Sequence, residues 1–415
     1  MDRELRKTPS KKILFISWDG YQTTYAEGLF MPIFQKVTEL SNQQYQFHYL
    51  QFSNASKKRT AITKATADKF NIPYQHVFIN KYNKLSPLSH LSAIITLLQS
   101  PRIINKILKE NHFDAIMPRS IFPAAMMNRM RGVDTKIIYD ADGLAADERV
   151  DFKGLKKSNF RYKYSLRTEQ SMFEKADHVI TRSEKCVDVH QLRIPTLSRD
   201  LFTVINNGRD KNFFKPNAEN RNQVRKELGV DDDELLLLFS GSLGDQYGWK
   251  EMVEIVRHVN KKTKAKWLVL TVNKEFAQEH LPADLTDRTM IKHVPFNQMA
   301  NYLNAGDVAF AIRQPSFSMQ GVCPIKLGEY LMMGLPTIAS KGIGDTEDIL
   351  NGAPSCFMFD HDLPSSTQDA ANWIENLQFT SSKTRDEIRE YGVSNFSLEQ
   401  TAEAYITVLN SVLTS

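Results

Sequence analysis

CPIKLGEYLMMGLPTIAS, residues 323–340, combines a short amphipathic helix, a Gly-Leu-Pro stop and a buried strand. Leu327, Tyr330 and Leu331 recur at helical spacing and predict a stripe that faces inward. A helix that leads directly into an apolar strand favours a parallel sheet covered by helices on both faces.

The same alternation of apolar runs and helical patterns extends along the chain. In the first half the runs are KKILFIS, YQFHYLQFS, HVFIN, FDAIMP, TKIIYDA and DHVITRS. In the second half they are LFTVINN, ELLLLFSG, KWLVLTV, TMIKHVPF, VAFAI, PTIAS and CFMFD. One open sheet does not comfortably hold so many strands, so we predict two doubly wound α/β domains.

The alternation restarts near VINNGRDKNFFKPNAENR, which is rich in Asn, Gly, Pro and charge. We therefore assign residues 1–200 to a first Rossmann-like domain and residues 201–395 to a second. Residues 396–415 are expected to form a helix that packs back on the first domain, with Ser397 as its N-cap. Ligands of open α/β sheets bind outside the carboxyl ends of the strands, which predicts a deep cleft between the two domains.

The composition limits the class of protein. With 415 residues, 41% hydrophobic and 24% charged, the chain is globular, and a net charge of +5 is too weak to argue for nucleic acid. Its three cysteines are far apart and show no zinc-binding spacing, which favours a reducing compartment. No apolar run has the length of a membrane span, so we expect a cytoplasmic protein, soluble or peripheral at the inner membrane face.

Three turns that follow strands carry residues suited to anions. Gly20 follows the first strand, and Gly241-Ser242 begins a glycine-rich loop that ends where Lys250 opens a helix. Arg313 lies where VAFAI ends. The spacings match neither GxGxxG nor a Walker A loop, so each turn is also open to interpretation as an ordinary βα connection.

Lys326 and Glu329 lie three residues apart, near the start of the helix in residues 323–340. A cation there is suited to phosphate, and the carboxylate is suited to the hydroxyl groups of a ribose. The alternative is a surface ion pair worth a few tenths of a kcal/mol, and the spacing alone favours neither.

VINNGRD, NFFKP, SGSLGDQYGWKEM, YLNAGDVAFAI and PIKLGEYLMMGLPTIAS occur in this order. This series resembles the nucleotide-sugar half of retaining GT-B glycosyltransferases of family 4 (glycosyl transferases group 1). MPRSIFPAAMMNRM, IIYDADGLAADERV, RTEQSMFEKADHVITRS and NFSLEQTAEAY resemble the acceptor half, so the resemblance covers roughly residues 12–412. It implies a GT-B fold and retaining transfer from a nucleotide-sugar, UDP-sugar by default, to a glycan, lipid-linked or other glycoconjugate acceptor.

The resemblance also implies roles for single residues. Lys326 would neutralise the donor diphosphate and Glu329 would bind the donor ribose. The other residues implied on the donor side are Gly20 near the sugar and phosphate, Gly241 and Ser242 under the phosphates, and the backbone of His293 and Val294, up to Pro295, beside the nucleobase.

Two positions depart from the family pattern. A glutamate that usually stands eight residues before Glu329 is Gly321 here, so Ser318 or Gln320 is expected to substitute on the sugar. Ser242 occupies the position of a phosphate-binding arginine, which leaves Arg313 and Lys250 as replacements. Lys326, Arg313 and loop amides would then stabilise the leaving diphosphate, with no metal ion or other cofactor required.

YDADG places Asp140 and Asp142 in a DxD pattern after a strand. One interpretation is a Mg²⁺ or Mn²⁺ site like that of GT-A glycosyltransferases, which would leave the second Rossmann half unexplained. We favour Asp142 near the acceptor hydroxyl as a catalytic residue, with Glu148 nearby and Arg119-Ser120 on the same side.

Residues 153–167, KGLKKSNFRYKYSLR, carry six cations and no acid, and HLSAIITLLQSPRIINKILK is apolar with basic residues toward its end. Together they suit contact with an anionic membrane, or else they form one solvated basic helix and one buried helix. Two further functions stay open, a GT-B-fold nucleotide-sugar epimerase or hydrolase and a non-catalytic glycosyltransferase-like partner subunit.

Overall fold

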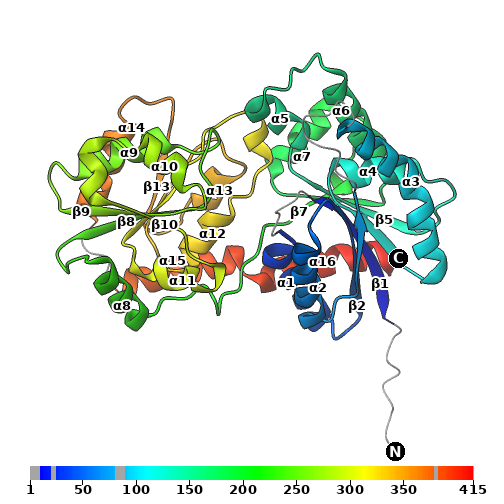
Figure 1. Cartoon of the computed structure of the whole chain (residues 1–415), viewed down its shortest axis with the longest axis horizontal. Coiled ribbons are helices and arrows are strands. Elements are labelled where there is room, and N and C mark those ends of the chain that lie inside the picture. The colour runs from blue at the N-terminus through cyan, green and yellow to red at the C-terminus, as the bar shows by residue number, and fades with distance from the viewer. Residues whose placement is uncertain (1–9, 20–24, 80–88, 378–381, 415) are drawn as a thin grey trace, which may run out of the picture. The chain divides into compact units, whose positions relative to one another are not determined.

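A computed structural model describes residues 10–19, 25–79, 89–377 and 382–414 of the chain. It divides into two compact units (Figure 1). Unit 1 comprises Met1–Ile205 and Leu398–Ser415, and unit 2 comprises Asn206–Ser397. The chain therefore passes from one unit to the other twice.

Unit 1 contains a seven-stranded parallel sheet with the order β3-β2-β1-β4-β5-β6-β7. Its strands are β1 (Lys11–Asp19), β2 (Tyr45–Ser53), β3 (Tyr74–Phe78), β4 (Ala115–Pro118), β5 (Lys136–Asp142), β6 (His178–Thr181) and β7 (Phe202–Val204). The sequence analysis was wrong about the last of them, because it placed LFTVINN in the second domain. Phe202 pairs with Val179 of β6, and the Ile205 amide donates to the Thr181 carbonyl at 2.9 Å. β7 therefore supplies hydrogen-bond partners for the backbone of β6 and belongs to unit 1.

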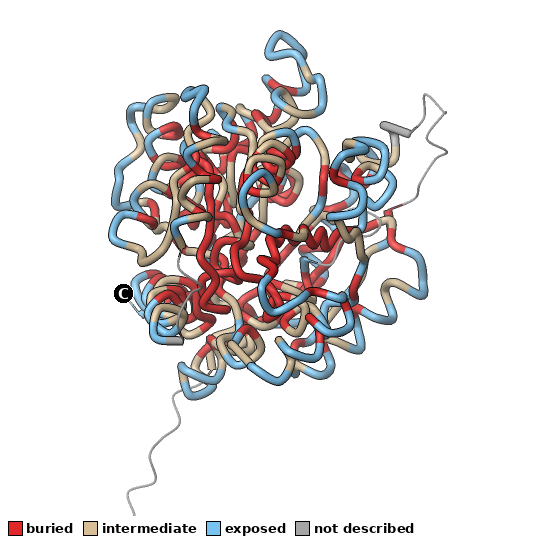
Figure 2. The backbone as a smooth tube through the Cα atoms, turned by 90° about the vertical axis from the view of Figure 1, so that its left-hand side faces the viewer, coloured by how far each residue is buried: buried red, intermediate tan, exposed pale blue. Residues whose placement is uncertain are grey.

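Unit 2 contains a six-stranded parallel sheet with the order β10-β9-β8-β11-β12-β13. Its strands are β8 (Leu235–Ser240), β9 (Ala265–Leu270), β10 (Thr289–Lys292), β11 (Val308–Ala311), β12 (Thr337–Ser340) and β13 (Cys356–Phe359). Every residue of β8 and β12 is buried, as continuous apolar strands covered on both faces require. The buried centre of the ribbon is red in Figure 2, whereas the outer turns are pale blue.

Helices connect the strands in both units. Unit 1 has α1 (Met31–Leu40), α2 (Lys57–Lys69), α3 (Ser89–Glu110), α4 (Ile121–Asn128), α5 (Ala145–Lys153), α6 (Phe160–Phe173), α7 (Glu184–Arg193) and α16 (Leu398–Leu413). Unit 2 has α8 (Ala218–Leu228), α9 (Trp249–Val259), α10 (Lys274–His280), α11 (Phe296–Ala305), α12 (Ile325–Met332), α13 (Thr346–Leu350), α14 (Ser366–Asn376) and α15 (Ser382–Phe396). Short turns of other helical types are η1 (Ala26–Phe30), η2 (Arg199–Leu201), η3 (Ala283–Arg288) and η4 (Ser318–Gly321). None of the helices within the described ranges is both long and apolar enough to cross a membrane.

The last helix, α16, is part of the core of unit 1. It packs on α1, and Ala402, Tyr405 and Leu409 are buried in the same cluster as Ile13 and Phe15 of β1. The C-terminal segment therefore completes a core that begins with the first strand.

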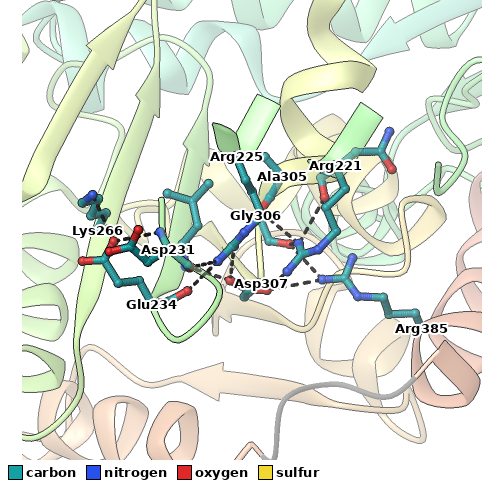
Figure 3. Close-up of polar contacts among 11 residues, drawn as sticks. Arg221, Arg225, Asp231, Glu234, Lys266, Ala305, Gly306, Asp307 and Arg385 are labelled. Atoms are coloured by element: carbon teal, nitrogen blue, oxygen red, sulfur yellow. Dashed lines mark hydrogen bonds and ion pairs between the residues drawn. The ribbon is translucent and has the colours of Figure 1, made fainter. Parts of the chain in front are cut away.

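A buried network of ions fixes the amino edge of the unit 2 sheet (Figure 3). Asp307, which precedes β11, accepts the Leu236 amide at 2.8 Å and pairs with Arg221 and Arg225 of α8. Burial and the nearby Arg221 lower the pKa of Arg385, beside the same carboxylate, to about 10. The guanidinium groups of Arg221 and Arg385 also donate to the carbonyls of residues 304–306. The network therefore holds α8 to the sheet at the amino ends of its strands.

A buried carboxyl group in unit 1 gives a test of this fold that depends on pH. Burial raises the pKa of Glu169 on α6 to about 8, against a partly compensating effect of Arg193. The folded state therefore binds a proton that the unfolded chain has released between its ordinary pKa and pH 8, and stability falls as pH rises through this window. We expect Glu169→Gln to flatten this fall between pH 6.5 and 8, as measured by urea unfolding of unit 1 across pH.

Glu174→Gln is the matched control, because Glu174 is exposed at the end of the same helix. It should leave the slope unchanged. An unaltered slope in Glu169→Gln would show that Glu169 is ionised in the folded protein.

Candidate functional site

The strand order of unit 2 marks one place on the sheet for a ligand. From β8 the chain proceeds outward to β9 and β10, and after β11 it proceeds the other way to β12 and β13. The switch point lies between the carboxyl ends of β8 and β11, where open α/β sheets bind ligands. Gly241 follows β8 and Arg313 lies just beyond β11, so two of the predicted residues flank this point.

The inward stripe of residues 323–340 is confirmed, since Leu327, Tyr330 and Leu331 are fully buried. Glu329 is also fully buried, and its Oε2 lies 2.7 Å from Lys326 Nζ. Lys326 and Glu329 therefore form a pair with one buried partner and one side chain that stays one-third exposed, rather than a solvated surface pair.

The second oxygen of Glu329 has a partner that the sequence analysis missed. Arg209 Nε donates to Glu329 Oε1 at 3.0 Å, with the arginine side chain only 11% exposed. The same segment also contacts the start of α12, because Asn207 donates to the Cys323 carbonyl at 3.3 Å. The motif VINNGRD marked this segment, but nothing in its spacing indicated contact with a residue 120 positions away.

α12 is joined to the loop that follows β8. The Tyr330 hydroxyl accepts the Ser240 amide at 2.8 Å. Beyond it, the Gly241 amide donates to the Leu270 carbonyl and the Leu243 amide to Asn273 Oδ1, both at 3.0 Å. These two amides are therefore already used within unit 2, and a phosphate would have to meet their neighbours.

The end of this loop requires a glycine that sequence reasoning did not select. A Cβ on Gly248 would lie 2.3 Å from Ile312 Cγ2, and the Gly248 amide donates to the Ile312 carbonyl at 3.1 Å. The loop is thereby held directly against the end of β11.

Arg313 is held from both sides at this end. Its side chain donates to Gln246 Oε1 at 3.2 Å and lies over the Tyr247 ring at 5.0 Å. Its amide donates to Ser340 Oγ at 3.0 Å. Its Nε is buried without a hydrogen-bond partner, which suits a group that awaits a ligand.

The other predicted donor-side residues that the structure describes lie on or next to several different elements of unit 2. Lys250 is exposed in the first turn of α9, and His293 and Val294 follow β10. Ser318 is buried in η4, with its hydroxyl 3.3 Å from that of Ser316. Gly20 lies outside the described residues.

In unit 1, two aspartates and two arginines meet at the carboxyl ends of β4, β5 and β6. Asp140 is fully buried, and Arg182 reaches its two oxygens at 2.8 and 2.9 Å. Arg119 bridges Asp140 at 2.5 Å and Asp142 at 2.8 Å. The Asp140 oxygens are therefore bound to guanidinium groups, which disfavours the interpretation of DxD as a divalent-cation site.

Asp142 differs from Asp140, because its side chain is 41% exposed. Partial desolvation would raise the pKa of Asp142, but Arg119 and Arg182 hold it below its ordinary value, so the carboxylate is charged at neutral pH. Asp142 and Ser120 have positive φ values of 65° and 63°, a strained geometry for non-glycine residues that is common at functional sites. Glu148, the second carboxylate expected here, lies half-buried in α5.

Residues 220–394, nearly all of unit 2, match the family model described as glycosyl transferases group 1. No sequence of a curated protein matches the chain. The family match and the two-unit fold together support glycosyl transfer.

Solved structures with the same fold cover both units. A glycosyltransferase from Rickettsia africae has a TM-score of 0.71 at 16% identity, covering 98% of this chain and 100% of that one. Anabaena Alr3699/HepE in complex with UDP has a TM-score of 0.67 at 14% identity, covering 96% and 100%. Sucrose-phosphate synthase from Thermosynechococcus elongatus has a TM-score of 0.67 at 15% identity, covering 97% and 99%. The fold is GT-B, with two Rossmann-like units.

The buried carboxylate predicts unequal effects of its two cations on stability. Arg209→Met should lower the free energy of unfolding of unit 2 by about 3 kcal/mol, because it leaves buried charge poorly compensated. Lys326→Met should cost about 1 kcal/mol or less, because the lysine is partly solvated.

Urea unfolding followed by tryptophan fluorescence measures this difference, since Trp249, Trp267 and Trp373 all lie in unit 2. Equal losses from the two substitutions would contradict the assignment of Arg209 as the main partner of Glu329.

Proposed function

We propose that the protein is a retaining glycosyltransferase that moves a sugar from a nucleotide-sugar, UDP-sugar by default, to a glycan, lipid-linked or other glycoconjugate acceptor. The observation that carries this proposal is the position of Arg313 just beyond β11, at the switch point of the unit whose residues 220–394 match glycosyl transferases group 1. Lys326 and Glu329 lie on α12, the next α-helix along the chain. The protein's role would be polysaccharide or glycoconjugate biosynthesis in the cytoplasm.

In this proposal the protein mainly stabilises charge. The bond between the anomeric carbon and the diphosphate oxygen breaks, and the acceptor oxygen bonds to the same carbon from the same face. The acceptor proton passes to the leaving phosphate. Lys326, Arg313 and the amides of Ser242 and Gly244 would stabilise the diphosphate, so the transfer needs no metal ion.

Glu329 would bind the donor ribose only after its local contacts rearrange. Its two oxygens bind Arg209 and Lys326 in the protein. When Lys326 turns to the diphosphate, Oε2 is released and accepts ribose hydroxyl groups, while Arg209 keeps the carboxylate in place. Donor binding would thus exchange one partner of Glu329 for another.

The acceptor would meet unit 1 at Asp142. Its charged carboxylate, held by Arg119 and Arg182, would orient the attacking hydroxyl through a hydrogen bond. The low pKa argues for orientation rather than for removal of a proton as a general base.

Lys326→Ala should reduce sugar transfer by two or more orders of magnitude, because one charge on the leaving diphosphate is lost. The matched control is Lys264→Ala, which removes an exposed lysine paired with Asp233 on the same unit. Both variants should keep the wild-type melting temperature within a few degrees. Near-wild-type transfer by Lys326→Ala would refute its role.

Thermal-shift measurements with UDP, GDP, ADP and their sugars test the donor class. Stabilisation by UDP and a UDP-sugar is the expected result. Release of the sugar without an acceptor would favour a hydrolase, formation of an epimeric sugar would favour an epimerase, and no stabilisation by any of these would favour a non-catalytic partner subunit.

Contact with an anionic membrane would bring a lipid-linked acceptor to the enzyme. On α3, Ile94, Ile95 and Leu98 are exposed, and α6 exposes Phe160 and Tyr164. Both helices pack against α4, so they lie on the same face of the unit 1 sheet. The six exposed cations beside Phe160 and Tyr164 are Lys153, Lys156, Lys157, Arg161, Lys163 and Arg167.

We expect the protein to float with vesicles that contain anionic lipid and not with zwitterionic vesicles. Phe160→Ser with Leu98→Ser should abolish flotation, and Ile62→Ser, an exposed apolar residue on α2, should not. Failure of the wild type to float with anionic vesicles would remove membrane contact from the proposal.

A further inference from the structure

Ser340, His361 and Glu251 of unit 2 form a chain of polar contacts, here called the relay, that has no role in the proposed transfer step. His361, which follows β13, has Nε2 2.9 Å from Ser340 Oγ at the end of β12. Its Nδ1 lies 3.6 Å from Glu251 Oε1 in the first turn of α9. The His361 side chain is only 10% exposed, so the relay is largely withdrawn from solvent.

The order Ser–His–Glu is that of a nucleophilic triad, but Ser340 is not placed to attack a substrate. The residue is 1% exposed, and its Oγ already accepts the amide of Arg313 at 3.0 Å. Because this oxygen is buried and already contacts both the Arg313 amide and the His361 imidazole, a substrate carbonyl cannot reach it.

The relay instead leads to the end of β11. Ser340 holds the Arg313 amide, and Glu251 Oε1 accepts Gln314 Nε2 at 2.8 Å. The His361 imidazole lies between these two acceptors, Ser340 Oγ and Glu251 Oε1. Burial alone would raise the pKa of Glu251, but the nearby His361 imidazole and the hydrogen bond from Gln314 hold it below the ordinary value, so a charged carboxylate anchors the relay.

The opposite side of this segment is held by the glycine-rich loop. The Gln314 amide donates to the Gln246 carbonyl at 3.0 Å, and the backbones of Tyr247 and Arg313 pair in an isolated antiparallel β-bridge. Arg313 therefore has its backbone fixed from two directions while its buried Nε has no partner. A guanidinium fixed in this way loses little conformational freedom when it binds an anion.

We infer that Ser340, His361 and Glu251 act together as positioning residues that fix Arg313 for the diphosphate of the donor. The role toward the donor rests on the proposed function. The restraint on the Arg313 backbone does not, so the two parts can be tested separately.

The backbone part is tested by hydrogen exchange of the peptide that contains Arg313, without ligand. His361→Ala should accelerate exchange of this peptide, because Ser340 loses the partner that orients its hydroxyl. His361→Gln should retain protection, because its amide supplies both a donor and an acceptor. His258→Ala, near the other end of α9, is the matched control. Unchanged exchange in His361→Ala overturns the relay.

The ligand part is tested by a double-mutant cycle with UDP and UMP, measured by calorimetry. His361→Ala should weaken UDP binding about fivefold and UMP binding much less. In an Arg313→Ala background it should weaken UDP no further, because the relay acts through Arg313. Additive effects would overturn that pathway.

The two proposals fail differently. Wild-type protein that binds no nucleoside diphosphate overturns the proposed function, and hydrogen exchange then still decides whether the relay restrains Arg313. Should His361→Ala not fold, Glu251→Ala takes its place and should likewise accelerate exchange of the peptide that contains Arg313, because it removes the carboxylate that faces His361 and Gln314. Unchanged exchange in that variant would overturn the relay.

Discussion

The buried carboxylate of Glu329 is the constraint on which the candidate site depends. An ionised group with no exposure to water must be compensated within the protein, and Arg209 and Lys326 do this from different segments. The carboxylate consequently fixes the entry segment of unit 2 to α12. From α12, Tyr330 extends the restraint to the end of β8.

Opposite edges of the unit 2 sheet are stabilised in different ways. At the amino edge, around Asp307, arginine donors are used on carboxylates and on backbone carbonyls. At the carboxyl edge, Arg313 Nε is buried without a partner, and Lys326 is one-third exposed. The arginines of the amino edge stabilise the fold through these contacts, whereas Arg313 and Lys326 at the carboxyl edge are still able to bind an anion.

The fold could be predicted from the sequence to a large extent, because apolar runs and turn residues are local signals. Each predicted run overlaps a strand, and the inward stripe of α12 is correct. The error at β7 has a physical cause, because a strand of three residues at a sheet edge takes its identity from its neighbour β6. Some predicted site residues, such as Gly241 and Arg313, lie just after strands, and Lys326 and Glu329 lie on the predicted helix. Their partners Arg209 and His361 arise from contacts over long sequence separations, which periodicity does not report.

The placement of α16 has a consequence for the order of synthesis. Unit 1 starts before unit 2 along the chain, yet its core lacks Ala402, Tyr405 and Leu409 until all of unit 2 has been translated. Unit 2 is contiguous in sequence and has left the ribosome almost entirely by then. Unit 2, although it begins second along the chain, is therefore the first that can complete its core. Until α16 packs, unit 1 has an uncovered apolar face that chaperones would recognise.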